Sequence, residues 1–204
     1  QGYDIVGIAQ TGTGKTAAFV LPLLERLKAN QNKAIPKHCG ALIIVPTREL
    51  AKQIDDNIDK YGASTYHQRA CIVGGMKYPR QIKRLNQGLD ILVATPGRLE
   101  DHLKSGNLSL AKTETIILDE ADQMLDLGFF PAIRRIVKQA PKARRAGRIV
   151  RWAREDNSSA FEAGHVLRVL EPARKPPKEG ALTRRTRTSA VLIAPPPAAP
   201  RRPA

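Results

Sequence analysis

The stretch Ala9-Gln10-Thr11-Gly12-Thr13-Gly14-Lys15-Thr16 lies between a short apolar run and a segment with helical periodicity. Gly12 and Gly14 allow backbone N–H groups to close around phosphate oxygens at the start of a helix. Lys15 adds a mobile positive charge, and Thr16 adds a hydroxyl that suits Mg²⁺. The stretch therefore predicts a phosphate-binding turn between a strand and a helix.

The flanking sequence supplies the strand and the helix that such a turn requires. Ala9 stands where the general phosphate-loop pattern has glycine, but residues 5–9 form an apolar run and residues 17–21 continue a helical pattern. We expect the phosphate contacts to come from six consecutive residues, which are Thr11, Gly12, Thr13, Gly14, Lys15 and Thr16.

Further apolar runs recur along the chain, and stretches with helical periodicity separate them. The runs are continuous rather than alternating, which is typical of parallel strands that are covered on both faces. They occupy residues 41–45, 70–73, 90–94 and 115–118. The alternation predicts βαβ units in a parallel sheet, with the chemically active loops at the C-terminal ends of the strands.

Positive charge is spread unevenly over the 204 residues. The formal net charge is +15, yet residues 1–139 carry 19 Lys and Arg against 14 Asp and Glu, and residues 140–204 carry 15 against 5. An excess of this size favours a polyanionic partner such as nucleic acid, or an anionic membrane surface. The two cysteines form no Cys-x-x-Cys pair, so a reducing, cytoplasmic compartment is expected. No apolar run is long enough to span a bilayer, and no membrane partner is expected.

Five stretches resemble, in order and in spacing, the first helicase domain of the DEAD-box ATP-dependent RNA helicases. They are Ala9–Thr16, Pro46–Ala51, Gly74-Gly75, Thr95–Arg98 and Asp119-Glu120-Ala121-Asp122. The sequence around them, at residues 88–94 and 124–129, looks most like the bacterial RhlE-type group. The resemblance covers about residues 2–143 and implies an α/β, RecA-like P-loop sheet that is parallel and has helices on both faces.

The resemblance also implies a nucleotide site. Asp119, at a strand end facing the phosphate loop, would hold Mg²⁺ together with Thr16. Glu120 would orient or deprotonate the attacking water, and Lys15 would act beside it on the ATP phosphates. Ala121 and Asp122 would help to couple the nucleotide state to RNA binding.

The remaining loops resemble the RNA-backbone motifs of the family. Backbone N–H groups at helix starts, a threonine hydroxyl and arginine side chains bind phosphate but carry little base information, so single-stranded RNA would be bound independently of its sequence. For Arg48 an internal salt bridge with Glu49 or Asp119 is the rival interpretation. The residues expected to bind RNA are Pro46, Thr47, Arg48, Gly74, Gly75, Thr95, Pro96, Gly97 and Arg98.

The chain departs from the family at both ends. Gln1 does not match the adenine-recognition segment that the family has upstream, so the preference for ATP comes from the resemblance alone. A Ser-Ala-Thr motif and a second RecA-like domain with an arginine finger are also missing. We therefore expect an incomplete N-terminal RecA-like domain at residues 1–143, which alone hydrolyses ATP very slowly and does not unwind RNA.

Residues 144–204 are rich in arginine, proline and alanine and are expected to form a largely disordered basic tail. One interpretation is a frameshifted product, in which case another reading frame of the DNA encodes Ser-Ala-Thr soon after residue 144. The other is a natural tail that adds non-specific RNA affinity.

The segment Gly147–Trp152 is the only replacement for the strand expected between the phosphate-loop strand and the strand ending at Asp119. Arg148 and Arg151 would meet covered faces of the sheet, where an unpaired arginine is unfavourable. The sequence therefore predicts an open or poorly packed sheet centre.

Two other classes of function stay open at this stage. A non-catalytic basic RNA-binding fragment would ignore ATP. A P-loop ATPase acting on DNA would use the same phosphate contacts, because these do not specify the sugar.

Overall fold

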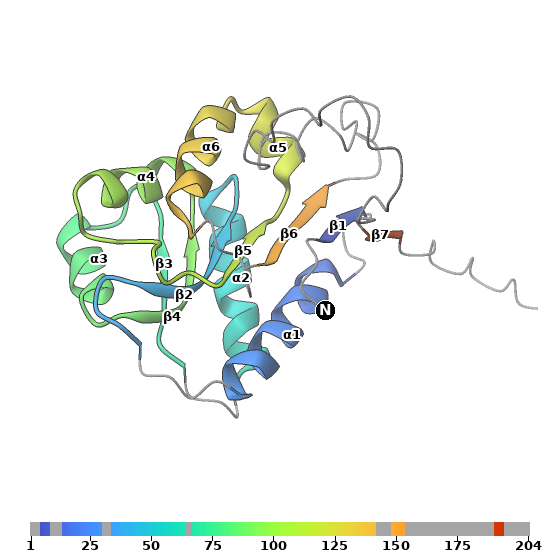
Figure 1. Cartoon of the computed structure of the whole chain (residues 1–204), viewed down its shortest axis with the longest axis horizontal. Coiled ribbons are helices and arrows are strands. Elements are labelled where there is room, and N and C mark those ends of the chain that lie inside the picture. Colours follow the sequence, from blue (N-terminus) through green and yellow to red (C-terminus); the bar gives the residue numbers. More distant parts are fainter. Residues whose placement is uncertain are drawn as a thin grey trace, which may run out of the picture.

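The computed structural model describes residues 14–29, 34–63 and 67–141 in full, together with the backbone of residues 5–8, 148–153 and 190–193. Its strands form one sheet in the order β3-β4-β2-β5-β6-β1-β7, and all the pairings between them are parallel (Figure 1). The strands are β1 (Ile5–Ile8), β2 (Cys39–Ile44), β3 (Arg69–Ile72), β4 (Leu89–Ala94), β5 (Thr115–Leu118), β6 (Arg148–Ala153) and β7 (Ala190–Ile193).

The helices lie between consecutive strands, as a parallel sheet requires. They are α1 (Lys15–Ala29), α2 (Arg48–Tyr61), α3 (Tyr78–Leu85), α4 (Pro96–Lys104), α5 (Ala121–Asp126) and α6 (Phe130–Gln139). Among the described residues, no helix has the length and the apolar character that crossing a membrane requires.

Each face of the sheet is covered by its own helices. On one face, α1 and α2 bury Val20 and Ile54 against the side chains of Ile43 and Val93. On the other face, buried residues of α3, α4, α5 and α6 pack against the alternate strand residues, such as Leu42. Because β2 is apolar toward both faces, its unbroken run Ala41–Ile44 is buried throughout. The predicted RecA-like parallel sheet with helices on both faces is confirmed.

The prediction of an open sheet centre is wrong, because backbone pairing is continuous across the centre of the sheet. β6 lies between β5 and β1, pairing Thr115 with Arg148 on one side and Ile5 with Val150 on the other. A ladder is made by backbone N–H and C=O groups, which arginine residues carry like any others, so two arginines do not prevent pairing. The side chains of β6 lie outside the described residues.

The predicted boundary at residue 143 does not end the sheet, because β6 and β7 both come from the segment 144–204. Residues 142–147, 154–189 and 194–204 lie outside the described residues, and so does the predicted disorder of the tail. The frameshift and natural-tail interpretations both stay predictions.

Candidate functional site

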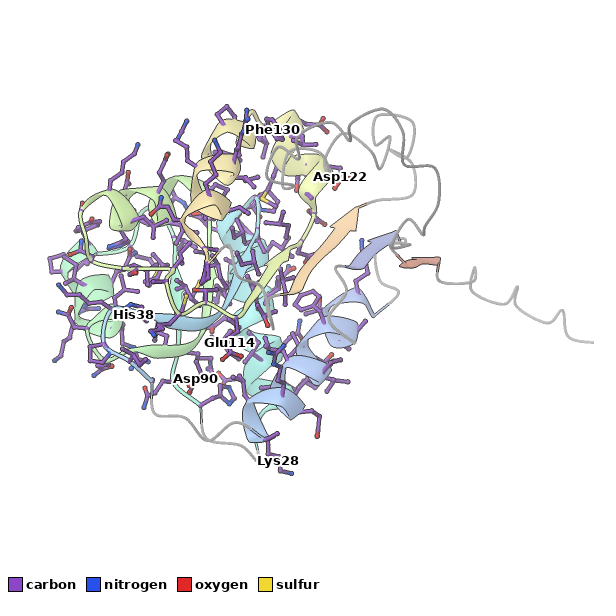
Figure 2. The ribbon with its side chains drawn as sticks, in the orientation of Figure 1. Lys28, His38, Asp90, Glu114, Asp122 and Phe130 are labelled. Atoms are coloured by element: carbon purple, nitrogen blue, oxygen red, sulfur yellow. The ribbon has the colours of Figure 1, made fainter. Side chains whose placement is uncertain are left out.

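Parallel pairing brings the predicted loops to one edge of the sheet. β2, β4 and β5 run side by side in the same direction, so the segments that follow them, at residues 45–48, 95–98 and 119–122, leave from the same edge. Figure 2 shows Asp122 toward this edge, with Asp90 and Glu114 toward the other. The predicted motifs are therefore neighbours in space although they are far apart in the sequence.

The described end of the phosphate loop begins α1. Gly14 has φ +81°, a conformation that glycine adopts readily, and its carbonyl accepts the first helical hydrogen bond from Ala18 N at 3.0 Å. Lys15 and Thr16 follow as the first residues of the helix. Thr11, Gly12 and Thr13 lie outside the described residues.

The Lys15 amine is a buried cation at the start of α1. Its Nζ is buried and has no hydrogen-bond partner among the described residues. A buried ammonium without a partner is costly, and phosphate oxygens are the groups that satisfy it in such a loop. This observation fits a nucleotide polyphosphate at the start of α1.

Asp119 lies close enough to Lys15 for the two charges to interact. Asp119 is only 3% exposed and follows the end of β5, where its Oδ1 accepts a hydrogen bond from Glu120 N at 3.1 Å. Burial raises the pKa of the Asp119 carboxyl to about 6, and the Glu120 charge adds to this, while the Lys15 charge lowers the pKa. The carboxylate and the Thr16 hydroxyl are both oxygen ligands of the kind that Mg²⁺ prefers, so the residues present fit this ion.

Glu120 has an unusual backbone conformation. Its φ of 50° and ψ of 50° lie in the left-handed region, which a glutamate rarely adopts, and the residue stands directly before α5. Conformations of this kind are concentrated at functional sites, where the surrounding structure enforces them. Ala121 and Asp122 then begin α5, and both are buried.

The loop after β2 begins with Pro46 and Thr47 and leads into α2. Thr47 caps that helix by accepting a hydrogen bond from Leu50 N at 3.2 Å. Arg48 lies over the turn after β3, since a Cβ placed on Gly74 would lie 3.3 Å from Arg48 Nη2. Within the described part of the chain, Arg48 forms no ion pair with Glu49 or Asp119.

The loop after β4 supplies the second arginine. Thr95 precedes α4, and Pro96 and Gly97 form its first turn. The Arg98 guanidinium lies 5.3 Å from the centre of the Tyr78 ring, and its Nε lies 3.9 Å from Asp101 Oδ2. The structure thus brings Thr47, Arg48, Gly74, Gly75 and Arg98 together at the edge where the phosphate loop also lies.

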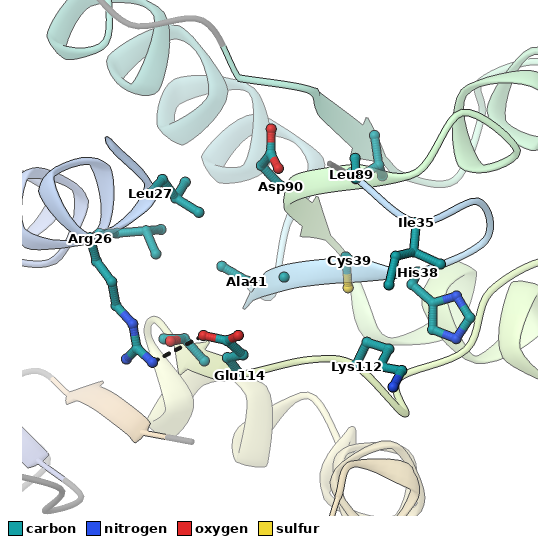
Figure 3. Close-up of a pocket in the computed structure, with 14 residues that line it drawn as sticks. Arg26, Leu27, Ile35, His38, Cys39, Ala41, Leu89, Asp90, Lys112 and Glu114 are labelled. Atoms are coloured by element: carbon teal, nitrogen blue, oxygen red, sulfur yellow. Dashed lines mark hydrogen bonds and ion pairs between the residues drawn. The ribbon is translucent and has the colours of Figure 1, made fainter. Parts of the chain in front are cut away.

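A large cavity at the opposite edge contains none of the predicted site residues. Its volume is about 420 Å³, and it is lined by the end of α1 and the starts of β2, β4 and β5 (Figure 3). The Arg26–Glu114 ion pair, with 3.0 Å between Nη2 and Oε2, crosses one side of it. This cavity is therefore separate from the candidate site.

Sequence reasoning missed the side chains that support the loops. Gln81 and His102 are buried behind the Gly74–Gly75 turn and the Thr95–Arg98 loop and are joined by a hydrogen bond. The helix α3 is strongly amphipathic, with Gln81 and Leu85 on its buried face, but a lone glutamine and a lone histidine form no motif. Only the structure brings them together.

The comparisons with known proteins agree with this geometry. Residues 1–150 match the family model described as DEAD/DEAH box helicase. Over 138 residues the chain is 45% identical to the ATP-dependent RNA helicase DBP2 of Chaetomium thermophilum and to that of Neurospora crassa. Each match covers 68% of this chain and 25% of the relative.

Two solved structures give the same result. A DEAD box protein from the hyperthermophile Methanococcus jannaschii matches with a TM-score of 0.66 and 40% identity, covering 74% of this chain and 39% of that one. A hypothetical ATP-dependent RNA helicase from Sulfolobus tokodaii matches with a TM-score of 0.65 and 35% identity, covering 80% of this chain and 46% of that one.

The chain therefore belongs to the DEAD/DEAH box helicase family. It spans about a quarter of the length of the curated relatives it matches. The relatives named here are fungal DBP2 proteins, so the RhlE-type assignment stays a prediction.

Proposed function

We propose that this chain is the ATP- and RNA-binding first domain of an ATP-dependent RNA helicase, which couples ATP hydrolysis to local opening of RNA duplexes. The observation that carries the proposal is the buried Lys15 amine, which has no partner among the described residues and interacts with the buried carboxyl of Asp119. A cation and a carboxylate held in this way suit a polyphosphate and its divalent metal.

Within this proposal each residue has a chemical role. Lys15 pairs with phosphate oxygens, and Thr16 and Asp119 hold Mg²⁺. The metal supplies charge neutralisation at the phosphates. Glu120, which directly follows Asp119, orients the attacking water or accepts its proton. Ala121 and Asp122, at the start of α5, couple the nucleotide state of the site to RNA binding.

The RNA backbone would lie along the same edge of the sheet. Arg48 and Arg98 supply positive charge there, and the turn at Gly74 and Gly75 offers backbone N–H groups to phosphate oxygens. The Thr47 hydroxyl already accepts a hydrogen bond from Leu50 N, and its own proton remains for an external acceptor. Such contacts grip the backbone of RNA without reading bases.

Binding of a fluorescent ATP analogue tests the nucleotide part. We expect binding in Mg²⁺ and much weaker binding in EDTA, with displacement by unlabelled ATP. Lys15→Ala should lower the affinity at least ~10-fold, because it removes the only charge aimed at the phosphates from α1. Lys28→Ala, at the exposed far end of the same helix, is the matched control and should bind like the wild type.

The same titration separates the rival functions. A non-catalytic RNA-binding fragment gives no nucleotide binding, with the Lys15→Ala protein equal to the wild type. Competition between RNA and DNA oligonucleotides of one sequence distinguishes an RNA helicase from an ATPase acting on DNA. Equal competition by both would count against the RNA assignment.

The cytoplasmic location and the RhlE-type assignment belong to this proposal as well. They rest on cysteine usage and on the sequence around the motifs, respectively.

A further inference from the structure

A buried network of polar contacts lies behind the RNA-facing loops. Its central residues, Gln81 and His102, are not among the predicted site residues. His102 of α4 is 0% exposed and Gln81 of α3 is 3% exposed. His102 Nε2 lies 2.8 Å from Gln81 Oε1, and Gln81 Nε2 donates to the carbonyl oxygen of Val73 at 2.9 Å. Buried polar groups of this kind are stabilising only when all of them are paired.

The hydrogen bonds assign one state to the histidine. Because the Gln81 amide nitrogen donates to Val73, its oxygen must accept, so His102 donates from Nε2. His102 Nδ1 then faces the Asn107 amide nitrogen, 3.5 Å away, as an acceptor. Burial lowers the pKa of His102, and the nearby Arg98 charge lowers it further, so the neutral form is favoured.

Tyr78 extends this network of contacts toward Arg98. Its ring stacks on the His102 ring with 4.3 Å between centroids and an angle of 4° between planes. The Arg98 guanidinium lies over the Tyr78 ring, with 5.3 Å between its Cζ atom and the ring centroid. The Tyr78 hydroxyl donates to Ser105 Oγ at 3.3 Å and accepts from Asn107 Nδ2 at 3.2 Å, which fixes the ring in place.

The network of contacts ends at the two RNA-facing loops. Val73 directly precedes the Gly74–Gly75 turn, and Arg98 ends the Thr95–Arg98 segment. We propose that Gln81, His102 and Tyr78 form a positioning strut that fixes the Gly74–Gly75 turn relative to Arg98, so that both meet phosphates of the same RNA strand. The inference rests on the proposed function, in which these loops bind RNA phosphates.

The strut acts through other residues and does not itself contact RNA. Gln81 holds the turn through the Val73 carbonyl, and the His102–Tyr78 stack supports the Arg98 guanidinium from below. Phosphate contacts depend on the spacing of their donors, so a shift of one loop against the other weakens both sets of contacts. Gln81 and His102 are thus expected to set RNA affinity from a buried position.

The test compares four single variants and one double variant, Gln81→Met/Arg98→Ala, of the whole chain in binding to a fluorescein-labelled single-stranded RNA. Gln81→Met removes both polar contacts while keeping the side-chain length, and His102→Phe keeps the stack on Tyr78 but loses the bond to Gln81. Arg98→Ala removes a direct phosphate contact. Gln87→Met, on an exposed glutamine just after α3, is the matched control.

We expect Gln81→Met and His102→Phe to weaken RNA binding about 5- to 10-fold, the size of the net loss of one hydrogen bond. In the Arg98→Ala background Gln81→Met should have a smaller effect, because coupled residues are not additive. Gln87→Met should bind as the wild type does. The Thr95 amide, which donates to the Ile72 carbonyl at 3.3 Å where the two loops begin, should exchange its hydrogen faster in the strut variants, while exchange in β2 and β4 stays unchanged.

Two results would overturn the strut. One is wild-type RNA affinity for both Gln81→Met and His102→Phe when Arg98→Ala does weaken binding. The other is unchanged exchange of the Thr95 amide hydrogen in both strut variants. If Arg98→Ala binds RNA normally, the proposed RNA site is wrong instead, and the exchange rates alone then decide whether the strut holds the turn.

Discussion

Lys15 and Asp119 form a pair of opposite charges that is poorly satisfied within the described residues. The Lys15 Nζ is buried without a hydrogen-bond partner there, and the pKa of Asp119 is raised to about 6 although a cation interacts with it. Burial therefore outweighs the attraction between the two groups. Buried charged groups that lack partners in the protein are typical of a site that binds a charged ligand.

The buried carboxyl gives a pH-dependent prediction for Asp119→Asn. Because the folded pKa is about 6 and the ordinary value is 3.8, the favourable contribution of the protonated carboxyl is complete below pH 3.8 and is lost as the pH rises through 6. The amide introduced by the substitution stays neutral at every pH. The variant should therefore be more stable than the wild type by about 3 kcal/mol at pH 7.5.

Urea unfolding at pH 4 and at pH 7.5 measures this difference. The gain in unfolding free energy of Asp119→Asn should be about 0.5 kcal/mol at pH 4 and about 3 kcal/mol at pH 7.5. A difference of the same size at both pH values would show that burial of charge is not its cause.

Gly75 should be intolerant of a side chain. Its φ is +79°, and a Cβ there would clash with Arg48 Nη1. Gly75→Ala should lower the free energy of unfolding by about 1–2 kcal/mol and displace the arginine from the turn. Thermal unfolding and RNA titration measure the two effects.

Gly97→Ala is the control for this substitution. A Cβ on Gly97 would meet no atom within 4 Å, and the residue lies in the first turn of α4. Alanine should leave stability unchanged or raise it slightly, since it is the better helix former. Equal losses of unfolding free energy in Gly75→Ala and Gly97→Ala would contradict the contact between Arg48 and the Gly75 turn.

The site residues divide into those that the sequence could predict and those that it could not. Lys15 and Asp119 are readable because phosphate chemistry requires their residue types at fixed spacing. Gln81 and His102 are not, because their roles depend on a carbonyl and a ring brought to them by the fold. Neither residue type has a meaning of its own in the sequence.

Among the elements, α2 shows how one residue serves both the fold and the site. Thr47 caps the helix through its hydroxyl oxygen, and the same hydroxyl faces the proposed RNA edge. Thr47→Ala should cost about 1 kcal/mol of stability, whereas Thr47→Ser keeps the cap and should cost much less. Chemical denaturation of the two variants measures the difference, and equal losses would show that the cap does not stabilise α2.

At the level of elements, the sequence predicts β2, β4 and β5 to within about two residues, because their apolar runs are bounded by proline, glycine or acidic residues. Arg148 and Arg151 make β6 a poor strand by composition. The structure pairs its backbone on both sides all the same. Composition alone could not reveal this, since pairing depends on which strands have a free edge.

For the whole molecule, the net charge of +15 predicts strongly salt-dependent binding to RNA. If Arg48 and Arg98 each contact one phosphate of a single-stranded RNA, the double variant Arg48→Ala/Arg98→Ala should reduce the slope of log affinity against log salt by about 1.4. Lys138→Ala, an exposed lysine of α6, is the control and should leave the slope unchanged. A slope that stays the same in the double variant would place the RNA elsewhere on the molecule.

A calorimetric double-mutant cycle on ATP binding in Mg²⁺, made from Lys15→Met, Asp119→Asn and the two together, tests whether Lys15 and Asp119 hold the nucleotide and its metal. We expect each single variant to weaken ATP binding at least ~10-fold and the two effects not to be additive, because both groups hold the same ATP·Mg²⁺ unit. Wild-type affinity in both single variants, or no heat of binding in the wild type, would contradict this role of the two residues.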